Sequence, residues 1–178
     1  MKLIKPDKKY ADSYYRAVEG YKENNIRLYE FFDMPFEKIV KYTDDMEKGE
    51  NLPKGWVPAT CLWFVDEQEF LGEISIRHEL TENLEKLGGH VGYGVRYDKW
   101  GQGIGTEMLR QAIFYIRENL PLKKILLTCK DDNYGSIAVI EKNGGGGAGQ
   151  NRKCGRWKKE TDKKILDRNI KIIKERLL

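Results

Sequence analysis

The sequence predicts an α+β protein in which helices flank a central mixed sheet. Residues 60–65 are mostly apolar and residues 70–77 alternate in hydrophobicity, and the short polar turn between them indicates an antiparallel hairpin. A glycine-rich stretch at 100–106 lies between another alternating strand and a helix with a regular apolar stripe. The almost wholly apolar run 124–129 follows that helix, and such a run is typical of a parallel strand with both faces buried. Antiparallel strands combined with a strand–helix–strand unit define this fold class.

The remaining elements follow from the same periodicities. They are a short strand at 1–5, helices at 10–25 and 35–48, a strand at 90–95 and a last helix at 133–143. Pro35 suits the first turn of its helix, and Gly144 suits the position just past the end of the last helix. Gly92 and Gly94 interrupt their strand and mark a place where a ligand or another chain lies against the backbone.

Length and composition indicate one folded domain. The chain has 178 residues, of which 40% are hydrophobic and 34% are charged, as in an ordinary globular protein with a buried core. No apolar run reaches the about 20 residues that span a bilayer, and the first residues lack the apolar core of a signal peptide. We therefore expect a cytoplasmic protein that binds no membrane. Cys61, Cys129 and Cys154 lack metal-ligand spacing, so we expect reduced thiols and no metal site.

The net charge of +4 is unevenly distributed along the chain. Residues 144–178 contain eleven Lys or Arg and four Asp or Glu, a net charge of +7, which leaves −3 for residues 1–143. The basic residues of the C-terminal part are scattered and have one aromatic neighbour, Trp157, whereas nucleic-acid binding uses a clustered basic face. The sequence therefore predicts a solvated basic tail and no nucleic-acid partner.

The glycine-rich stretch has the properties of a phosphate-binding loop. Glycines occupy alternate positions in Gly101-Gln102-Gly103-Ile104-Gly105-Thr106 at the start of a helix. Without Cβ atoms their backbone N–H groups can approach an anion closely, and the helix N-terminus adds about half a positive charge. The spacing is neither a Walker A loop, which requires Gly-Lys-Ser/Thr, nor a Rossmann fingerprint, whose third glycine lies three residues after the second. A diphosphate bound by these residues is the expected ligand.

The order of elements and motifs over residues 1–145 resembles the GNAT superfamily of acyl-CoA-dependent N-acetyltransferases. The family signature, Arg or Gln, two residues, Gly, one residue and then Gly or Ala, falls on residues 100–105. The second family motif resembles Asn133 together with Glu141-Lys142-Asn143-Gly144. A bacterial subgroup of the family resembles this chain at Arg77-His78-Glu79-Leu80 and at Gly88-Gly89-His90-Val91-Gly92-Tyr93. The resemblance implies a GNAT domain that transfers an acetyl group from acetyl-CoA to a primary amine of a small molecule or peptide.

Two positions depart from the family pattern. Trp100 stands where the family usually has Arg or Gln, so a side-chain contact to phosphate is missing, whereas the backbone N–H groups of residues 101–106 remain. Ile140 stands where many members carry the tyrosine that protonates the departing thiolate, so no acid is assigned. Both departures favour an alternative function, a module that binds acetyl-CoA with little or no catalysis.

The resemblance also implies where the pantetheine arm of the cosubstrate binds. The strand at 90–95 separates from the strand at 124–129, and the arm pairs with the exposed backbone of Tyr93, Gly94 and Val95. One backbone N–H there stabilises the developing oxyanion of the thioester.

Four side chains are candidates for catalysis or binding. The amine must lose a proton before it attacks, because an alkyl ammonium has a pKa of about 10.4. His90 lies where many members place the glutamate that acts through water, and Glu73 on the neighbouring strand is the second candidate base. A hydrogen-bonded structural histidine and a solvated or salt-bridged carboxylate are the respective alternatives. Asn133 binds the cosubstrate or caps its helix, and Lys142 meets a phosphate or is an exposed lysine.

Residues 146–178 form an atypical basic tail in which the last two strands of the family are not recognisable. With AT-rich codons, a shifted reading frame of residues 150–171 restores the Arg-Tyr-Trp-Ile pattern of the last family strand. We therefore hypothesise that a single-base slip in the glycine run 144–147 replaced the native C-terminus, which would expose sheet edges and favour a homodimer. The alternative is a native amphipathic helix from Thr161 whose apolar face is formed by Leu166, Ile170, Ile173 and Leu177.

Overall fold

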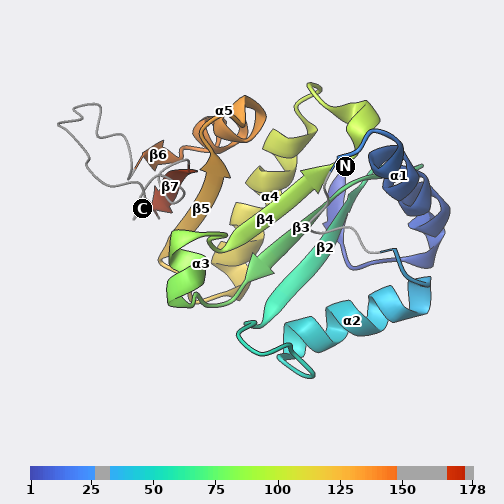
Figure 1. Cartoon of the computed structure of the whole chain (residues 1–178), viewed down its shortest axis with the longest axis horizontal. Coiled ribbons are helices and arrows are strands. Elements are labelled where there is room, and N and C mark those ends of the chain that lie inside the picture. The colour runs from blue at the N-terminus through green and yellow to red at the C-terminus, as the bar shows by residue number, and fades with distance from the viewer. Residues whose placement is uncertain (27–32, 148–167, 175–178) are drawn as a thin grey trace.

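The computed structural model describes residues 1–26, 33–147 and 168–174 of the chain (Figure 1). The strands are β1 Lys2–Ile4, β2 Ala59–Val65, β3 Phe70–Arg77, β4 Val91–Val95, β5 Lys124–Lys130, β6 Gly146–Gly147 and β7 Arg168–Lys174. The helices are α1 Ala11–Glu23, α2 Phe36–Lys48, α3 Glu82–Lys86, α4 Ile104–Asn119 and α5 Tyr134–Lys142, with 3-10 turns η1 Lys8–Tyr10 and η2 Tyr97–Lys99. Every strand and helix that the sequence predicts before residue 144 is present. The short α3 and the two 3-10 turns were not predicted.

Strands β1 to β4 form an antiparallel sheet in the order β1-β2-β3-β4. The predicted hairpin is confirmed, with Trp63 of β2 opposite Glu73 of β3. Its turn is held by Asp66, whose Oδ1 accepts the N–H groups of Gln68 and Glu69 at 2.8 Å each. An aspartate that satisfies the backbone in this way favours a turn over further strand.

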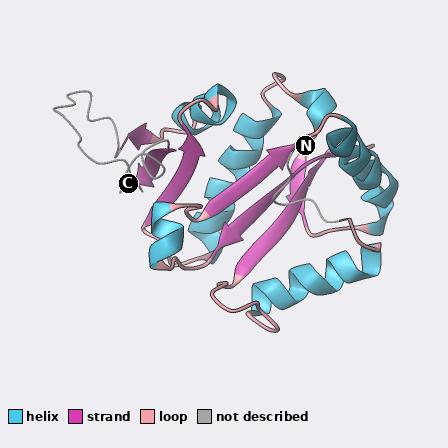
Figure 2. Ribbon diagram, viewed as in Figure 1, coloured by secondary structure: helices cyan, strands magenta, loops and turns pink. Residues whose placement is uncertain are grey.

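Two apolar layers cover opposite faces of this sheet. On one face, α1 and α2 bury Tyr14 and Ile39 against Trp63 and Phe70, and the Tyr14 and Trp63 rings stack with centroids 4.6 Å apart. On the other face lies α4, which passes behind β3 and β4 in Figure 1 and is seen between strands in Figure 2. Its predicted stripe is buried, with exposed fractions of 7% or less, at Met108, Leu109, Ala112, Ile113 and Ile116. These two layers fix the position of β4, which carries the site described below.

The predicted parallel, doubly buried strand at 124–129 is wrong in its pairing. Within the described residues no ladder joins β4 to β5; the chain just before β4 meets β5 at a bridge between Gly89 and Leu127, and the two arrows diverge toward their tips in Figure 1. Burial also alternates along β5, since Ile125 and Leu127 are buried while Leu126 is half-buried. The apolar run therefore has one buried face and one partly covered face. Within the described residues, β5 pairs in an antiparallel ladder with β7 and not with β4.

The tail departs from its predicted structure over residues 168–174. Instead of the helical alternative, these residues form β7. One edge of β7 pairs antiparallel with the whole of β5, and the other edge of β7 pairs with β6. Three β-branched isoleucines, at 170, 172 and 173, favour a strand. The edge of β5 that does not pair with β4 is available to this strand. Leu166 and Leu177 lie outside the described residues. The single-base slip stays a prediction that the gene sequence tests directly.

Three further expectations concern membranes, metals and thiols. Across residues 1–26, 33–147 and 168–174, no helix is both long and apolar enough to cross a bilayer. In the same part of the chain, no group of three or more His, Cys, Asp or Glu side chains is placed to hold a metal ion. Cys61 and Cys129 are buried and form no disulfide within the described residues, as expected for reduced thiols, and Cys154 lies outside those residues.

Candidate functional site

A glycine-rich loop, residues 101–106, comprises the end of the connection from η2 and the first residues of α4. Gly101 and Gly103 have φ angles of 77° and 79°, in the left-handed region that glycine adopts without strain. The first backbone hydrogen bond of α4 runs from the Glu107 N–H to the Gly103 carbonyl at 3.1 Å, so the helix does not use the N–H groups that precede Glu107. No described atom lies within 4 Å of the position that a Cβ would take on Gly101 or Gly103. The loop therefore offers N–H groups that the backbone bonds of α4 leave unused, at a positive helix end next to the exposed residues 101–103, and this arrangement suits a diphosphate.

Gly105 brings three elements together behind this loop. A Cβ on Gly105 would stand 3.3 Å from Val139 Cγ2 of α5 and 3.3 Å from Val95 Cγ2 of β4. It would also stand 3.8 Å from the Tyr93 ring. Because residue 105 has no side chain, α4, α5 and β4 meet closely at the first turn of α4.

This contact predicts different outcomes for two substitutions of Gly105. Alanine requires neighbouring atoms to shift by a few tenths of an ångström, and we expect a change of less than about 1 kcal/mol in the free energy of unfolding. Valine adds two methyl groups to the same contact and should destabilise the protein by about 1–3 kcal/mol. Urea denaturation of both variants measures the difference, and equal stability of Gly105→Ala and Gly105→Val would contradict the close packing.

Strand β4 has one paired edge and one open edge. The Arg96 N–H donates to a β3 carbonyl at 2.9 Å, and backbone groups along an antiparallel strand point alternately to its two sides. The N–H and C=O of Gly94 therefore face β3, where Gly94 lies opposite Glu73. Those of Tyr93 and Val95 face away from β3, on the side where the described residues form no ladder. Of the three residues predicted to pair with a pantetheine arm, Tyr93 and Val95 thus have the required orientation.

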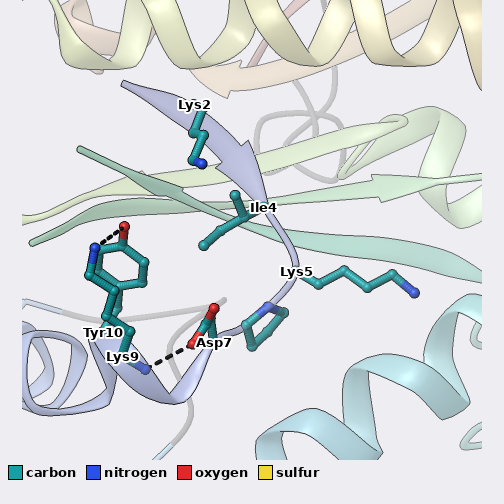
Figure 3. Close-up of a pocket in the computed structure, with 7 residues that line it drawn as sticks. Lys2, Ile4, Lys5, Asp7, Lys9 and Tyr10 are labelled. Carbon is teal, nitrogen blue, oxygen red and sulfur yellow. Dashed lines mark hydrogen bonds between the residues drawn. The ribbon is translucent and has the colours of Figure 1, made fainter. Parts of the chain in front are cut away.

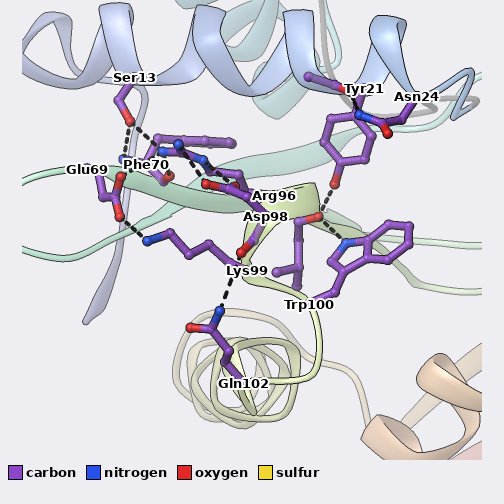
Figure 4. Close-up of polar contacts among 12 residues, drawn as sticks. Ser13, Tyr21, Asn24, Glu69, Phe70, Arg96, Asp98, Lys99, Trp100 and Gln102 are labelled. Carbon is purple, nitrogen blue, oxygen red and sulfur yellow. Dashed lines mark hydrogen bonds and ion pairs between the residues drawn. The ribbon is translucent and has the colours of Figure 1, made fainter.

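The Val95 carbonyl marks the end of this open edge. It accepts hydrogen bonds from Trp100 Nε1, at 2.7 Å, and from the Tyr21 hydroxyl of α1, so both its lone pairs are used (Figure 4). The groups left for a ligand are the Val95 N–H and the N–H and C=O of Tyr93. Trp100 departs from the family signature, and its side chain fixes the start of the glycine-rich loop to β4. Sequence reasoning missed Tyr21 because it lies 74 residues before Val95.

A polar network anchors η2, which leads into the loop (Figure 4). Arg96 donates to both carboxylate oxygens of Asp98, at 2.7 and 3.0 Å, and to Glu69 Oε2 at 2.8 Å. Lys99 forms an ion pair with the other Glu69 oxygen at 2.6 Å, and Ser13 of α1 accepts from Arg96 at 3.1 Å. A bidentate Arg–carboxylate pair is geometrically specific, so the network fixes the direction in which the chain leaves β4.

Asn133 and Lys142 are the residues of the α5 region that were predicted to bind the cosubstrate. Asn133 caps α5, because its Oδ1 accepts the Ser136 N–H at 3.0 Å, while contact with a cosubstrate stays a prediction. Lys142 is exposed in the last turn, and its role toward phosphate stays a prediction. Asn143 was named from the sequence only as part of the second family motif, and no contact was predicted for it. Its Nδ2 donates to the Thr106 carbonyl at 3.1 Å and so ties the end of α5 to the glycine-rich loop.

His90 joins β4 to β5 at the end where the two strands are closest. Its N–H donates to the Leu126 carbonyl at 2.8 Å, and its Nδ1 accepts the Leu126 N–H at 3.0 Å. Burial, followed by the charge of Arg77, lowers the pKa of His90, which favours the neutral ring. With Nδ1 accepting, the ring proton is on Nε2, so the lone pair that a base requires is already engaged. This geometry favours the hydrogen-bonded structural alternative for His90.

Two substitutions of His90 separate a structural role from a catalytic one. Asparagine places an acceptor near the position of Nδ1, and we expect His90→Asn to retain kcat within about threefold. Alanine leaves the Leu126 N–H without its acceptor and should cost about 1–3 kcal/mol of unfolding free energy. Thermal unfolding and steady-state kinetics measure both effects. A folded His90→Asn protein with kcat reduced 100-fold would restore His90 as the base.

Glu73 of β3 is buried, with 2% of its surface exposed. It was expected on a polar face, but α1 covers that face. Cross-strand neighbours point to the same side, so Glu73 and Ser75 share their face with Gly94 and Gly92, which carry no side chains. His90 is four residues from Gly94 along β4, about 13 Å at 3.3 Å per residue, so the structure does not bring the two candidate bases together.

Two buried tyrosines beside the site predict a loss of stability in alkali. Burial raises the pKa of Tyr21 to about 12, aided by the charges of Asp98 and Glu73, and burial raises the pKa of Tyr93 to about 12. In the unfolded chain both ionise near pH 10, so their stabilisation is complete below pH 10 and is lost between about pH 10 and 12. Each Tyr→Phe variant should show a smaller decline over this window, by up to about 1.4 kcal/mol per pH unit. Identical declines in urea unfolding would contradict the assignment.

Two surface hollows lie away from these residues. One, of about 450 Å³, is lined by Lys2, Ile4, Lys5, Pro6, Asp7, Lys9 and Tyr10 (Figure 3). The other, of about 460 Å³, lies between β1 and α4. In the first, Lys5 pairs with Glu47 at 2.6 Å and Lys9 donates to a backbone carbonyl at 3.1 Å. These lysines are already engaged, so the glycine-rich loop remains the better anion site.

The fold and the loop define a class of acyl-transferring proteins, and a family model identifies it. Residues 8–145 match the model described as "Acetyltransferase (GNAT) domain". This match spans well over half of the chain, which therefore belongs to the GNAT family of N-acetyltransferases, enzymes whose acetyl donor is acetyl-CoA.

Solved structures share this fold at low sequence identity. The Microcin C7 self-immunity acetyltransferase MccE, in complex with acetyl-CoA and AMP, has a TM-score of 0.62 and 19% identity, covering 97% of this chain and 91% of that chain. Mycobacterium smegmatis RimJ, in complex with CoA-disulfide, has a TM-score of 0.65 and 16% identity, covering 97% of this chain and 80% of that chain. Ribosomal-protein-S5-alanine acetyltransferase from Vibrio fischeri has a TM-score of 0.60 and 18% identity, covering 97% of this chain and 91% of that chain.

Proposed function

We propose that the protein transfers the acetyl group of acetyl-CoA to a primary amine. The proposal is carried by one observation: loop N–H groups at 101–106 that α4 does not use follow, one 3-10 turn later, a strand with an open backbone edge at Tyr93 and Val95. A diphosphate supplies charged oxygens for the loop, and the amides of a pantetheine arm match the donors and acceptor of the edge. The neighbours solved with acetyl-CoA and with CoA-disulfide support this choice of cosubstrate.

Glu73 is the residue that we assign as the base. Its carboxylate lies on a sheet face where β4 contributes no side chain at Gly92 or Gly94, so an amine that approaches the open edge meets no β4 side chain there. A carboxylate in this place accepts the amine proton, directly or through water, as the nitrogen attacks the carbonyl carbon. The outward N–H groups of Tyr93 and Val95 are available to the oxyanion that develops on the carbonyl oxygen.

The acceptor is proposed at the level of a primary amine. The Vibrio fischeri relative is named for an alanine of ribosomal protein S5, and MccE is named for microcin self-immunity, so both peptide and small-molecule amines belong in the test. The second candidate function is an acetyl-CoA-binding module with little catalysis. It is favoured by Ile140, which is buried at 1% exposure and offers no hydroxyl where many family members have a tyrosine.

Calorimetric titration with acetyl-CoA, followed by a thiol-release assay over a panel of amines, tests the proposal. The panel contains alanine-initiated peptides, lysine peptides and small alkyl amines. Binding with amine-dependent thiol release is the expected result. Binding without release from any amine favours the module, and the absence of acetyl-CoA binding contradicts both functions.

A further inference from the structure

The side chain of Tyr93 has a feature that its backbone role does not explain. Its hydroxyl is buried and, within the described part of the chain, has no hydrogen-bond partner. Ser136 of α5 lies near the hydroxyl, but the two side chains form no hydrogen bond of standard geometry. A buried hydroxyl without a partner is unfavourable for folding, so such a group is rarely retained without a role.

The position of this side chain connects it with the open edge of β4. The Tyr93 backbone belongs to β4, and its side chain lies opposite Ile74 of β3, packs against the core on the α4 face and has its hydroxyl near Ser136 of α5. Its ring approaches Gly105 at the start of α4, 3.8 Å from where a Cβ would stand. The same residue therefore presents backbone groups to the open edge and a hydroxyl beneath it.

We propose that the Tyr93 hydroxyl donates a hydrogen bond to the sulfur of coenzyme A as the thiolate departs. This inference rests on the proposed function, because it requires the acyl thioester to lie along the open edge of β4. It assigns to β4 a stabilising donor that Ile140 of α5 cannot supply, since isoleucine has no hydroxyl.

The chemistry of the step is balanced without transfer of the tyrosine proton. The C–N bond forms, the C–S bond breaks, the electron pair of that bond goes to sulfur, and Glu73 receives the amine proton. Burial raises the pKa of Tyr93 to about 12, above the about 8.5 of an alkyl thiol, so the proton stays on the tyrosine oxygen. The hydroxyl thus stabilises the thiolate as a fixed donor, and solvent protonates the thiolate after release. Removal of a fixed donor that is aimed at developing charge lowers kcat by about 100-fold.

The experiment compares wild-type protein with Tyr93→Phe, and uses Tyr115→Phe of α4 as the matched control. The thiol pKa of bound coenzyme A is measured by the ultraviolet absorbance of its thiolate as pH is varied. This readout needs no catalysis and no acceptor. We expect the bound thiol pKa to be about one unit lower in wild type and in Tyr115→Phe than in Tyr93→Phe, a tenfold difference in the thiolate to thiol ratio.

Three further readouts complete the test. Tyr93→Phe should bind acetyl-CoA with unchanged Kd, melt at the same or a higher temperature because it loses an unpaired hydroxyl, and lose about 100-fold in kcat. Equal thiol pKa values in wild type and Tyr93→Phe would overturn the role of Tyr93 while leaving the proposed function intact. Failure of coenzyme A to bind either protein would overturn the proposed function, and the Tyr93 assignment with it.

Discussion

Replacement of Glu73 by glutamine should lower kcat for amine acetylation by about 100-fold or more, while the Kd for acetyl-CoA stays unchanged. Glutamine keeps the size of the side chain but cannot accept the proton that the amine must lose. Glu73 is buried opposite Gly94 and so lies one strand away from the open edge of β4. The effect should therefore fall on the chemical step and not on cosubstrate binding.

Steady-state kinetics and calorimetry measure this prediction, with Glu79→Gln as the control because Glu79 is an exposed carboxylate just beyond β3. Thermal unfolding establishes that both variants are folded. A Glu73→Gln enzyme with kcat within threefold of wild type would exclude Glu73 as the base. A parallel fall in acetyl-CoA affinity and melting temperature would instead indicate that Glu73 supports the fold.

Substitution of Gly103 by valine should weaken acetyl-CoA binding at least about tenfold, or 1.4 kcal/mol. Gly103 has a φ of 79°, and a β-branched residue in this left-handed region costs about 1–2 kcal/mol. The loop relieves this strain by moving, which turns the N–H groups that follow Gly103 away from a common ligand. Because no described atom lies within 4 Å of the Cβ position, the protein itself should still fold.

Gly20 of α1 provides the matched control for Gly103. It also has no described atom within 4 Å of its Cβ position, but it lies inside a helix. Gly20→Ala should bind acetyl-CoA as wild type does and should stabilise the protein by about 0.5–1 kcal/mol. Calorimetric titration of both variants decides the matter, and undiminished affinity in Gly103→Val would mean that the loop conformation is not needed for binding.

The sequence was sufficient where local pattern determines structure. The glycine-rich loop, the apolar stripe of α4 and the turn at Asp66 depend on neighbouring residues, and all three are present where predicted. The capping of α5 by Asn133 is of the same kind. In each case a hydrogen bond or a helical period within a few residues carries the information.

The sequence was insufficient where contacts between distant elements decide the outcome. Glu73 alternates with apolar residues and was therefore expected on a polar face, but α1 buries it. The apolar run of β5 cannot reveal which strand will pair with it, and β7, more than 35 residues later, is the partner. The contacts of Tyr21 and Trp100 with the Val95 carbonyl likewise require the folded chain.

The structure of the protein with acetyl-CoA bound tests most directly the central claim that the main-chain N–H groups of residues 101–106 bind the diphosphate. We predict diphosphate oxygens within hydrogen-bond distance of these groups and a pantetheine arm paired with the outward backbone of Tyr93 and Val95. An ordered acetyl-CoA molecule on another surface, such as the hollow beside Lys2 and Tyr10, with no anion at the loop, would contradict the claim.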